Sequence, residues 1–173
     1  MMTQEEYTKA AKYWTEKETT SKRMDKDALW KAMEAYIQAN NTCALATGSG
    51  EFVRCTPIEY AYYDGAFWMF SEGGLKFQAL AHNKHVCLAI FDSYQGFGKL
   101  NGMQVSGIAQ MIDSDLEAFR KAARHKNIPD AALEKIAHLL HLIKVTPTRI
   151  DFLSSSFQKE GYDSRQFLTF ETE

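Results

Sequence analysis

The sequence is poor in proline, glycine and cysteine, and its net charge is close to zero. Its 173 residues include 3 Pro, 10 Gly and 3 Cys, which excludes collagen-like and linker compositions. Hydrophobic residues make up 45% and charged residues 24%, so whole-chain disorder is excluded as well. A net charge of −2 does not favour a polyanion, so we expect no nucleic-acid partner. The length predicts one domain over residues 1–173.

The three cysteines are odd in number and widely spaced, and no CxxC motif is present. Cys43, Cys55 and Cys87 stand among apolar or strand-like neighbours, which predicts reduced, buried thiols in a cytosolic protein. The first ten residues are polar and helical in character, unlike an apolar signal sequence. No apolar run approaches the length of a membrane span. We therefore expect a soluble, cytoplasmic protein with no membrane partner.

Residues 1–40 predict two helices. The first spans Thr3 to Glu18 and carries an apolar stripe at spacings of three and four. The stripe consists of Tyr7, Ala10, Ala11 and Trp14. We expect it to pack against the body of the protein. Asp25 caps the second helix, and Asn40-Asn41 ends it, because Asn tolerates the left-handed backbone conformation.

Residues 42–153 predict strands with inserted helices. The expected strands cover residues 42–47, 52–63, 66–71, 86–92, 103–112 and 144–153. The expected helices cover 75–81, a segment that starts with a capping box at Ser114, and a segment from Pro129 to about Ile143. Residues 154–173 form a polar tail that we expect on the surface.

Hairpin-type connections between the strands predict a mainly β fold with antiparallel pairing. The most economical architecture is a small closed or nearly closed barrel with peripheral helices. Closure removes the exposed edges that a long strand such as residues 52–63 would otherwise present.

The Asp64-Gly65 pair between two strand-like runs is a strong hairpin signal. A two-residue loop fixes the pairing of the flanking strands, from Tyr63 opposite Ala66 to Ile58 opposite Ser71. One face of this hairpin then carries Arg54, Thr56, Ile58, Met69 and Ser71. Its three polar members are expected to form a cluster at the open end of the hairpin.

The segment Glu72-Gly73-Gly74-Leu75-Lys76 follows this cluster directly. The two glycines permit a tight entry into a helix, whose first backbone N–H groups can receive an anion. Arg54 can bind a phosphate through two parallel hydrogen bonds, and Lys76 can add a point charge. These residues predict a phosphate site. The alternative is that Arg54 pairs with Glu51 or Glu59 while Lys76 is solvated.

The run from Phe52 to Asp92, followed by MQVSGIAQ, resembles the pyridoxamine 5′-phosphate oxidase-like family of FMN-binding split barrels. The family pattern has an Arg early in the second strand, a Thr or Ser at the end of the hairpin, a Lys in the following helix and a V-x-G strand ending. In this sequence the matching residues are Arg54, Ser71, Lys76 and Val105-Ser106-Gly107. The likeness covers about residues 42–112, and a shorter match lies at VTPTRIDF, residues 145–152.

This resemblance implies a flavin site at the start of the barrel. Arg54 and Lys76 would bind the FMN phosphate, and Ser71 would add a phosphate or ribityl hydrogen bond. Thr56 and the backbone of residues 55–58 would line the isoalloxazine edge. The cofactor-binding residues implied are therefore Arg54, Cys55, Thr56, Pro57, Ile58, Ser71, Lys76 and Gln104. The resemblance also implies a homodimer with the flavin between two subunits, where residues 94–101 would reach the partner's flavin.

Two departures from the family pattern argue against pyridoxamine phosphate as the substrate. Gly102 stands where true pyridoxamine-phosphate oxidases carry Gln, and the last residues lack their Arg-rich motif although Arg165 is present. The expected function is an FMN-dependent oxidoreductase for an unidentified small molecule, without a catalytic residue that we can name. The alternatives are a non-catalytic flavin- or haem-binding protein and a protein that holds a deazaflavin in the same cleft.

Two His-x-x-His pairs, His82 with His85 and His138 with His141, are expected to be packing or capping histidines rather than a metal site. Zinc usually requires three or four ligands, and neither pair has a third at matching spacing. Haem-binding relatives of this fold exist, so one of these histidines could bind iron.

Overall fold

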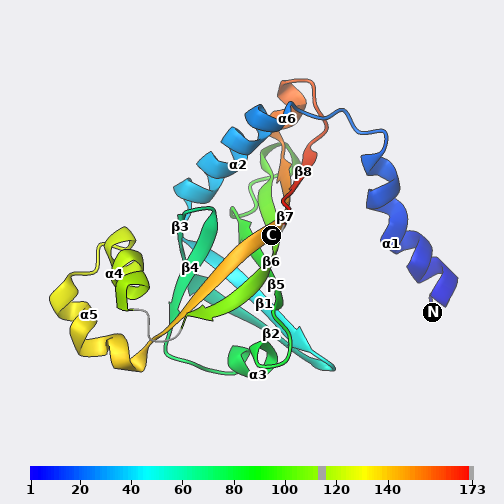
Figure 1. Ribbon diagram of the computed structural model, residues 1–173. Helices are drawn as coiled ribbons and strands as arrows, with labels where there is room; N and C mark the ends of the chain where they lie inside the picture. Colours follow the sequence, from blue (N-terminus) through cyan, green and yellow to red (C-terminus); the bar gives the residue numbers. More distant parts are fainter. Residues whose placement is uncertain (113–115, 172–173) are drawn as a thin grey trace.

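The structure is a computed structural model that describes residues 1–112 and 116–171. The helices are α1 (Gln4–Glu18), α2 (Lys26–Ala39), α3 (Lys76–Leu80), η1 (Phe97–Lys99), α4 (Leu116–His125), α5 (Asp130–Ile136), η2 (Ala137–Leu139) and α6 (Ser156–Lys159). The strands are β1 (Thr42–Ser49), β2 (Phe52–Glu59), β3 (Ala61–Tyr63), β4 (Ala66–Ser71), β5 (His85–Phe91), β6 (Asn101–Ile112), β7 (His141–Ser154) and β8 (Arg165–Thr169). The predicted mainly β fold is confirmed (Figure 1).

All strand pairs are antiparallel, in the order β2-β1-β5-β6-β7-β4-β3, and β8 also pairs with β7. The two ends of this path, β2 and β3, are consecutive in the chain and are joined through Tyr60. The sheet must therefore curl until its two ends meet, which produces the nearly closed barrel.

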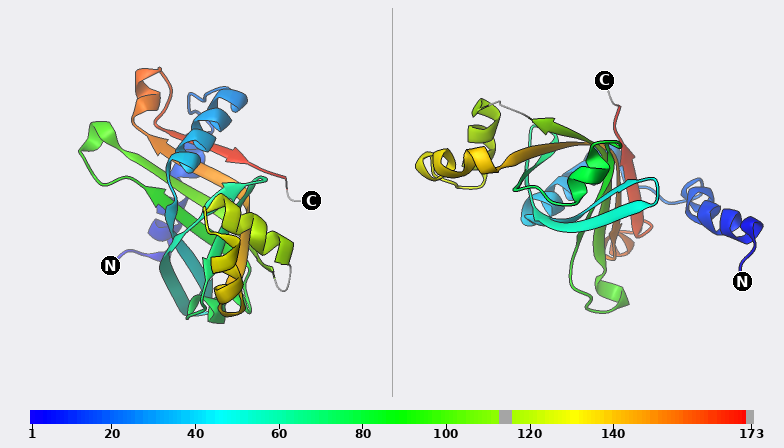
Figure 2. Two further views of the ribbon diagram at one scale, coloured as in Figure 1. Left: turned by 90° about the vertical axis from the view of Figure 1, so that its left-hand side faces the viewer. Right: turned by 90° about the horizontal axis from the view of Figure 1, so that it is seen from below.

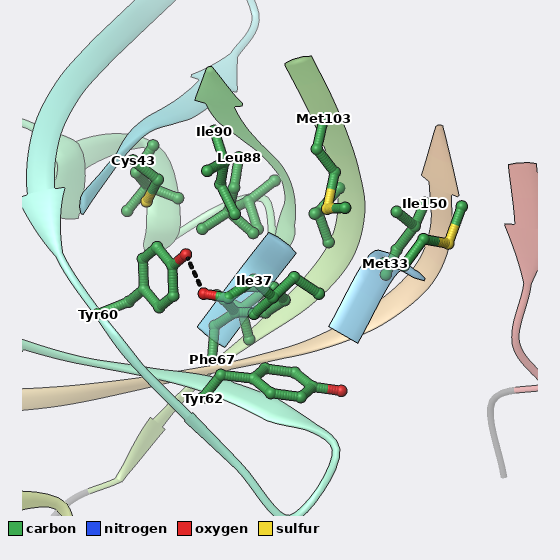
Figure 3. Close-up of a cluster of buried hydrophobic side chains, with 14 of the residues drawn as sticks. Met33, Ile37, Cys43, Tyr60, Tyr62, Phe67, Leu88, Ile90, Met103 and Ile150 are labelled. Atoms are coloured by element: carbon green, nitrogen blue, oxygen red, sulfur yellow. Dashed lines mark hydrogen bonds between the residues drawn. The ribbon is translucent and has the colours of Figure 1, made fainter. Parts of the chain in front are cut away.

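The strand expected over residues 52–63 is broken at Tyr60, so that prediction is wrong in its length. The Tyr60 phenol group is buried and donates a hydrogen bond of 2.8 Å to the carbonyl oxygen of Ile37 in α2 (Figure 3). This anchor to a helix redirects the chain from the β1 side of the barrel to the β4 side. The hairpin around Asp64 is confirmed for three residues a side, with Tyr62 opposite Phe67.

The interior of the barrel is filled by large apolar side chains from the strands and from α2. Leu29, Met33 and Ile37 are fully buried at spacings of four, which places one face of α2 against the sheet. They pack against strand residues that include Phe67 and Leu88 (Figure 3). The expected second helix and its Asp25 cap are confirmed, since the Asp25 carboxylate accepts hydrogen bonds from the first turn.

A second, smaller core lies under α4 and α5, which protrude together from one side of the barrel (Figure 2). It contains Phe119 and Leu133 from the helices and Leu142 from β7. The prediction of a helix up to Ile143 is wrong, because β7 begins at His141. Leu142 is buried under the helices, whereas Ile143 is buried in the barrel. Because this apolar run is buried on both faces of the strand, its sequence does not alternate between apolar and polar residues and cannot be told from a buried helix. The expected cap at Ser114 lies outside the described residues.

The predicted packing of the α1 stripe is wrong for most of the helix. Thr3 caps α1 through a capping box, yet none of the helical residues is buried. Figure 1 shows α1 apart from the sheet on the side of β8. Its contacts with the body are near its end, where Arg149 donates to Glu18 at 2.6 Å and Arg165 stacks on Trp14 at 4.4 Å.

The expected polar surface tail is also wrong. Residues 156–159 form α6, and β8 adds to the free edge of β7 beside β4. Phe157 and Leu168 join the barrel core, and the Gln166 amide donates to the backbone carbonyls of Lys22 and Asp163. Few apolar residues mark this segment, so its polar composition conceals the strand.

The cysteines differ in exposure, against the expectation that all three are buried. Cys43 is buried, Cys87 is partly buried and Cys55 is exposed, and none forms a disulfide. Burial, with a smaller contribution from Cys55, raises the pKa of the Cys43 thiol to about 12. None of the helices in the described part of the chain is long and apolar enough to cross a bilayer.

Gly107 lies where β6 and β7 approach each other closely, next to a register shift. A Cβ at this position would lie 2.6 Å from the Thr146 carbonyl oxygen and 2.8 Å from Cγ1 of Val145. The glycine of the Val105-Ser106-Gly107 pattern is therefore required by strand packing.

We expect Gly107→Ala to lower the free energy of unfolding by about 1–3 kcal/mol, because backbone or core atoms must move to admit the methyl group. Gly98→Ala is the matched control, since nothing lies within 4 Å of a Cβ at Gly98. Urea denaturation measures both variants, and equal stability of the two would contradict the packing explanation.

Candidate functional site

Arg54 and Thr56 lie on the inner face of β2, where the predicted alternation places them. In the register of β1 with β2, Arg54 lies opposite Thr47 and Thr56 lies opposite Leu45, whose side chain is in the core. The predicted pairing of Ile58 with Ser71 is wrong, because β2 pairs with β1 while Ser71 in β4 pairs with β7. Barrel closure, rather than a continuous hairpin, brings β2 and β4 together.

Ser71 and Lys76 are both 7% exposed, at the point where β4 leads into α3. The Ser71 hydroxyl contacts the backbone of Gly73, accepting from its N–H at 3.1 Å. Gly73 and Gly74 have φ angles of 123° and 98°, a region that favours glycine. This turn folds back so that the Lys76 ammonium donates to the Gly73 carbonyl oxygen. The double glycine therefore holds the lysine beside Ser71.

The Lys76 ammonium has no carboxylate partner among the described residues. Its hydrogen-bond acceptor is a single backbone carbonyl. Burial lowers its pKa, because removal from water disfavours the charged form. A buried cation without a counter-charge is costly to a folded protein, and a bound anion would relieve that cost.

Thr47 supplies a second unsatisfied group at this end of the barrel. Its side chain is 3% exposed, and its hydroxyl oxygen has no hydrogen-bond partner among the residues that the structure describes. It lies directly across the β1–β2 pair from Arg54, and α3 packs against both strands. A bound oxyanion could accept the hydroxyl proton that no protein group receives.

Arg54 is exposed, and no ion pair or hydrogen bond occupies its guanidinium group within residues 1–112 and 116–171. The alternative of a pair with Glu59 does not occur, because Lys126 donates to that carboxylate at 2.7 Å. A pair with Glu51 is not formed either. Arg54 thus remains available for a ligand. Because α3 has only five residues, the side chains rather than a helix dipole give this end its positive charge.

The other predicted cofactor residues do not gather in this cluster. Cys55 and Pro57 alternate to the outer face of β2, and Ile58 packs against the barrel core. Gln104 lies on the outer face of β6, three strands from β2. The loop that contains residues 94–101 extends away from the barrel, and its Tyr94 and Phe97 side chains are 68% and 84% exposed (Figure 2).

The sequence predictions missed two neighbours of this cluster. Thr47 could have been found from the register of the hairpin closed by Gly50-Glu51. His141 lies opposite Ser71 on β7, and its ring centroid is 4.9 Å from that of Phe77 in α3. The sequence predicts a helix over His141, and this prediction conceals the contact. Within the described ranges, no three His, Cys, Asp or Glu side chains are grouped so that they could hold a metal ion.

Comparisons with known proteins agree with this architecture. No curated protein has a significantly similar sequence. A heme-binding protein from Mycobacterium smegmatis is 22% identical with a TM-score of 0.58, over 79% of this chain and 56% of that one. A FAD-binding protein from Mesorhizobium loti is 19% identical with a TM-score of 0.54, over 68% and 88% of the two chains.

A third similar structure is a general stress protein 26-related protein of the pyridoxinephosphate oxidase family from Clostridium acetobutylicum. It is 13% identical with a TM-score of 0.57, over 85% of this chain and 97% of that one. At these identities the likeness shows the fold. The family model described as pyridoxamine 5′-phosphate oxidase matches residues 29–154, which is most of the chain and includes the whole barrel except β8. The chain therefore belongs to the pyridoxamine 5′-phosphate oxidase family.

Proposed function

We propose that the protein binds FMN between two copies of itself and acts as an oxidoreductase on a small molecule. The observation that carries the proposal is the Lys76 ammonium, which is buried and has no carboxylate partner in the described part of the chain. Membership of a family named for an oxidase supports it, as does the similarity to a FAD-binding protein.

The groups at this end of the barrel fit a phosphate monoester. Arg54 can donate two parallel hydrogen bonds, and Lys76 supplies a second positive charge. The Thr47 hydroxyl, which has no partner among the described residues, supplies a further hydrogen-bond donor. A phosphate dianion balances two cations, so the cluster becomes neutral when it is occupied. Ser71 holds the glycine turn in place and adds a hydroxyl at the rim.

The flavin ring would lie along the free edge of β2. That strand ends the path of the sheet, so within the described residues no second strand is hydrogen-bonded to its outer backbone groups. Pro57 lacks an N–H group, which leaves acceptors in excess of donors along this edge. When bound, the flavin supplies hydride and electron transfer, and the role of the backbone at residues 55–58 is to orient it.

A second copy of the chain would complete the site. The family resemblance of the sequence implies a homodimer with the flavin between its subunits. Tyr94 and Phe97 contact each other at a ring-centroid distance of 6.1 Å, but both rings are largely exposed in a single copy. Exposed aromatic side chains are typical of interfaces, so we assign this loop to contact with the partner's flavin or its surroundings.

A haem-binding role is the second candidate, supported by the similarity to a heme-binding protein. His85 lines a hollow of about 400 Å³ on the outer face of the sheet, beside Cys87 and Val53. The absorption spectrum of the purified protein separates haem from flavin. Bleaching by a reduced nicotinamide, followed by reoxidation, would support the oxidoreductase role.

We expect Arg54→Ala combined with Lys76→Ala to weaken FMN binding by about a hundredfold to ten-thousandfold, because two charge-assisted interactions with the phosphate are lost. Riboflavin has the same ring without the phosphate, so its affinity should change little. Calorimetric titration with both ligands measures the difference.

The matched control for this double variant is Arg124→Ala with Lys135→Ala, an arginine and a lysine exposed on α4 and α5. It removes the same charges far from the cluster and should leave FMN binding unchanged. Equal losses in both double variants would show a general charge effect. Unchanged FMN affinity in the first variant would refute the site.

We expect Lys76→Met to raise the stability of the cofactor-free protein at pH 7, where the native lysine carries its buried charge. At pH values between the lowered pKa of Lys76 and its ordinary value of 10.5, the lysine is protonated in the unfolded chain but has lost its proton in the folded protein. Native stability therefore rises through that window, and the advantage of the variant shrinks. Urea denaturation at several pH values measures this. Lys135→Met is the control, and an advantage that does not depend on pH would contradict the assignment.

A further inference from the structure

The outer face of the sheet contains a second hollow, away from the Lys76 cluster. It has a volume of about 210 Å³ and is bounded by β5, β6, β7 and β8. Ala89 and Gly102 have at most a methyl group as a side chain, so they leave space between the larger residues of the lining. We call these two residues the floor of the hollow. Phe91, which is 66% exposed, stands on one side, and Leu153 with Arg165 stands on the other.

Arg165 borders this hollow with an unsatisfied guanidinium group. Its Nε atom is buried and has no hydrogen-bond partner, and no carboxylate within the described ranges pairs with it. The guanidinium carbon lies 4.4 Å from the ring centroid of Trp14 in α1. The indole ring therefore fixes the position of the cation and leaves its hydrogen-bonding capacity unused.

The nearby carboxylates are not hydrogen-bonded to Arg165, because they are paired with Arg149. Arg149 donates to Asp151 at 2.8 and 2.6 Å and to Glu18 at 2.6 Å. Its guanidinium group also lies 4.2 Å from the ring centroid of Phe167, and Arg23 lies 3.8 Å from the same centroid. The lining of the hollow itself contains one cation, Arg165, and one carboxylate, Asp151, which accepts its hydrogen bonds from Arg149 and leaves Arg165 without a paired carboxylate.

We propose that this hollow binds a small carboxylate with an apolar body, such as an aromatic acid. The carboxylate would accept hydrogen bonds from Arg165. The apolar body would lie over Gly102 and Ala89 against the ring of Phe91. The Gln104 amide, which also lines the hollow, can hydrogen-bond a polar substituent.

A monoanion fits this hollow better than a phosphate dianion. One guanidinium group without a paired carboxylate can pair with one negative charge. The Asp151 carboxylate is also part of the lining, and it would repel the second charge of a phosphate. The floor of Ala89 and Gly102 favours an apolar group over a bare ion.

The test is calorimetric titration of the full chain with benzoate, with benzamide as the uncharged analogue and inorganic phosphate as the dianion. Benzoate is expected to bind at least tenfold more tightly than either of the others. Failure of benzoate to bind would overturn the proposal, and so would equal affinity for benzamide or phosphate.

Three variants locate the binding. Arg165→Gln is expected to weaken benzoate binding at least tenfold, whereas Arg124→Gln, at an exposed arginine of α4, should leave it unchanged. Gly102→Val keeps every charge and fills the floor; a Cβ there would lie 3.8 Å from Cβ of Phe91, an ordinary contact. It too should abolish binding, so the proposal remains testable even if Arg165→Gln does not fold. Benzoate affinity that survives Gly102→Val would overturn the proposal.

The titration is run with and without added FMN, and also on Arg54→Gln. Binding of benzoate without any flavin, unaffected by Arg54→Gln, assigns the ligand to the Arg165 hollow even if the flavin proposal fails. Loss of benzoate binding in Arg54→Gln would place the ligand at the Lys76 cluster and overturn this inference.

Discussion

The closure of the barrel at Tyr60 is the constraint on which the rest of the structure depends. The strands at the two ends of the sheet are consecutive in the chain, so the sheet must curl until β2 and β3 meet. The buried hydrogen bond from Tyr60 to the end of α2 fixes this junction. Closure then brings β2, whose inner face carries Arg54, into contact with β4 and with α3, which begins at Lys76. The positive cluster is thus a product of long-range topology rather than of one hairpin.

Local signals in the sequence account for the parts of the fold that were predicted correctly. The capping residues Thr3 and Asp25 mark their helices, and the Asp64-Gly65 turn sets the pairing of Tyr62 with Phe67. Tyr60 carries no local signal of a break, because an aromatic residue is as typical of a strand as its neighbours. The start of β7 was hidden for a related reason, since its apolar run faces two cores. Hydrophobic periodicity identifies a helix or strand only when one of its faces is buried and the other is exposed.

Residues of the candidate site could be predicted only where the alternation of side chains along one strand determines which face of the sheet they occupy. Arg54 and Thr56 share the inner face of β2 as the pattern requires, and Lys76 follows the double glycine as expected. Gln104 lies on the opposite face of the sheet, because its placement depends on β5 and β6. Thr47 went unnoticed because a threonine in a strand is ordinary until its hydroxyl is found buried and unpartnered. Among the described residues, cations without a paired carboxylate therefore lie on both faces of the sheet, at Lys76 and at Arg165.

The most direct test of the central claim is phosphorus NMR of FMN bound to the protein, recorded from about pH 5 to 8. The second ionisation of a free phosphate monoester has a pKa near 6, so its signal moves through this range. Contact with the Arg54 and Lys76 cations would stabilise the dianion and lower that pKa. The account predicts a bound phosphorus signal that stays at the dianion position over the whole range. A bound signal that titrates like that of free FMN would contradict it.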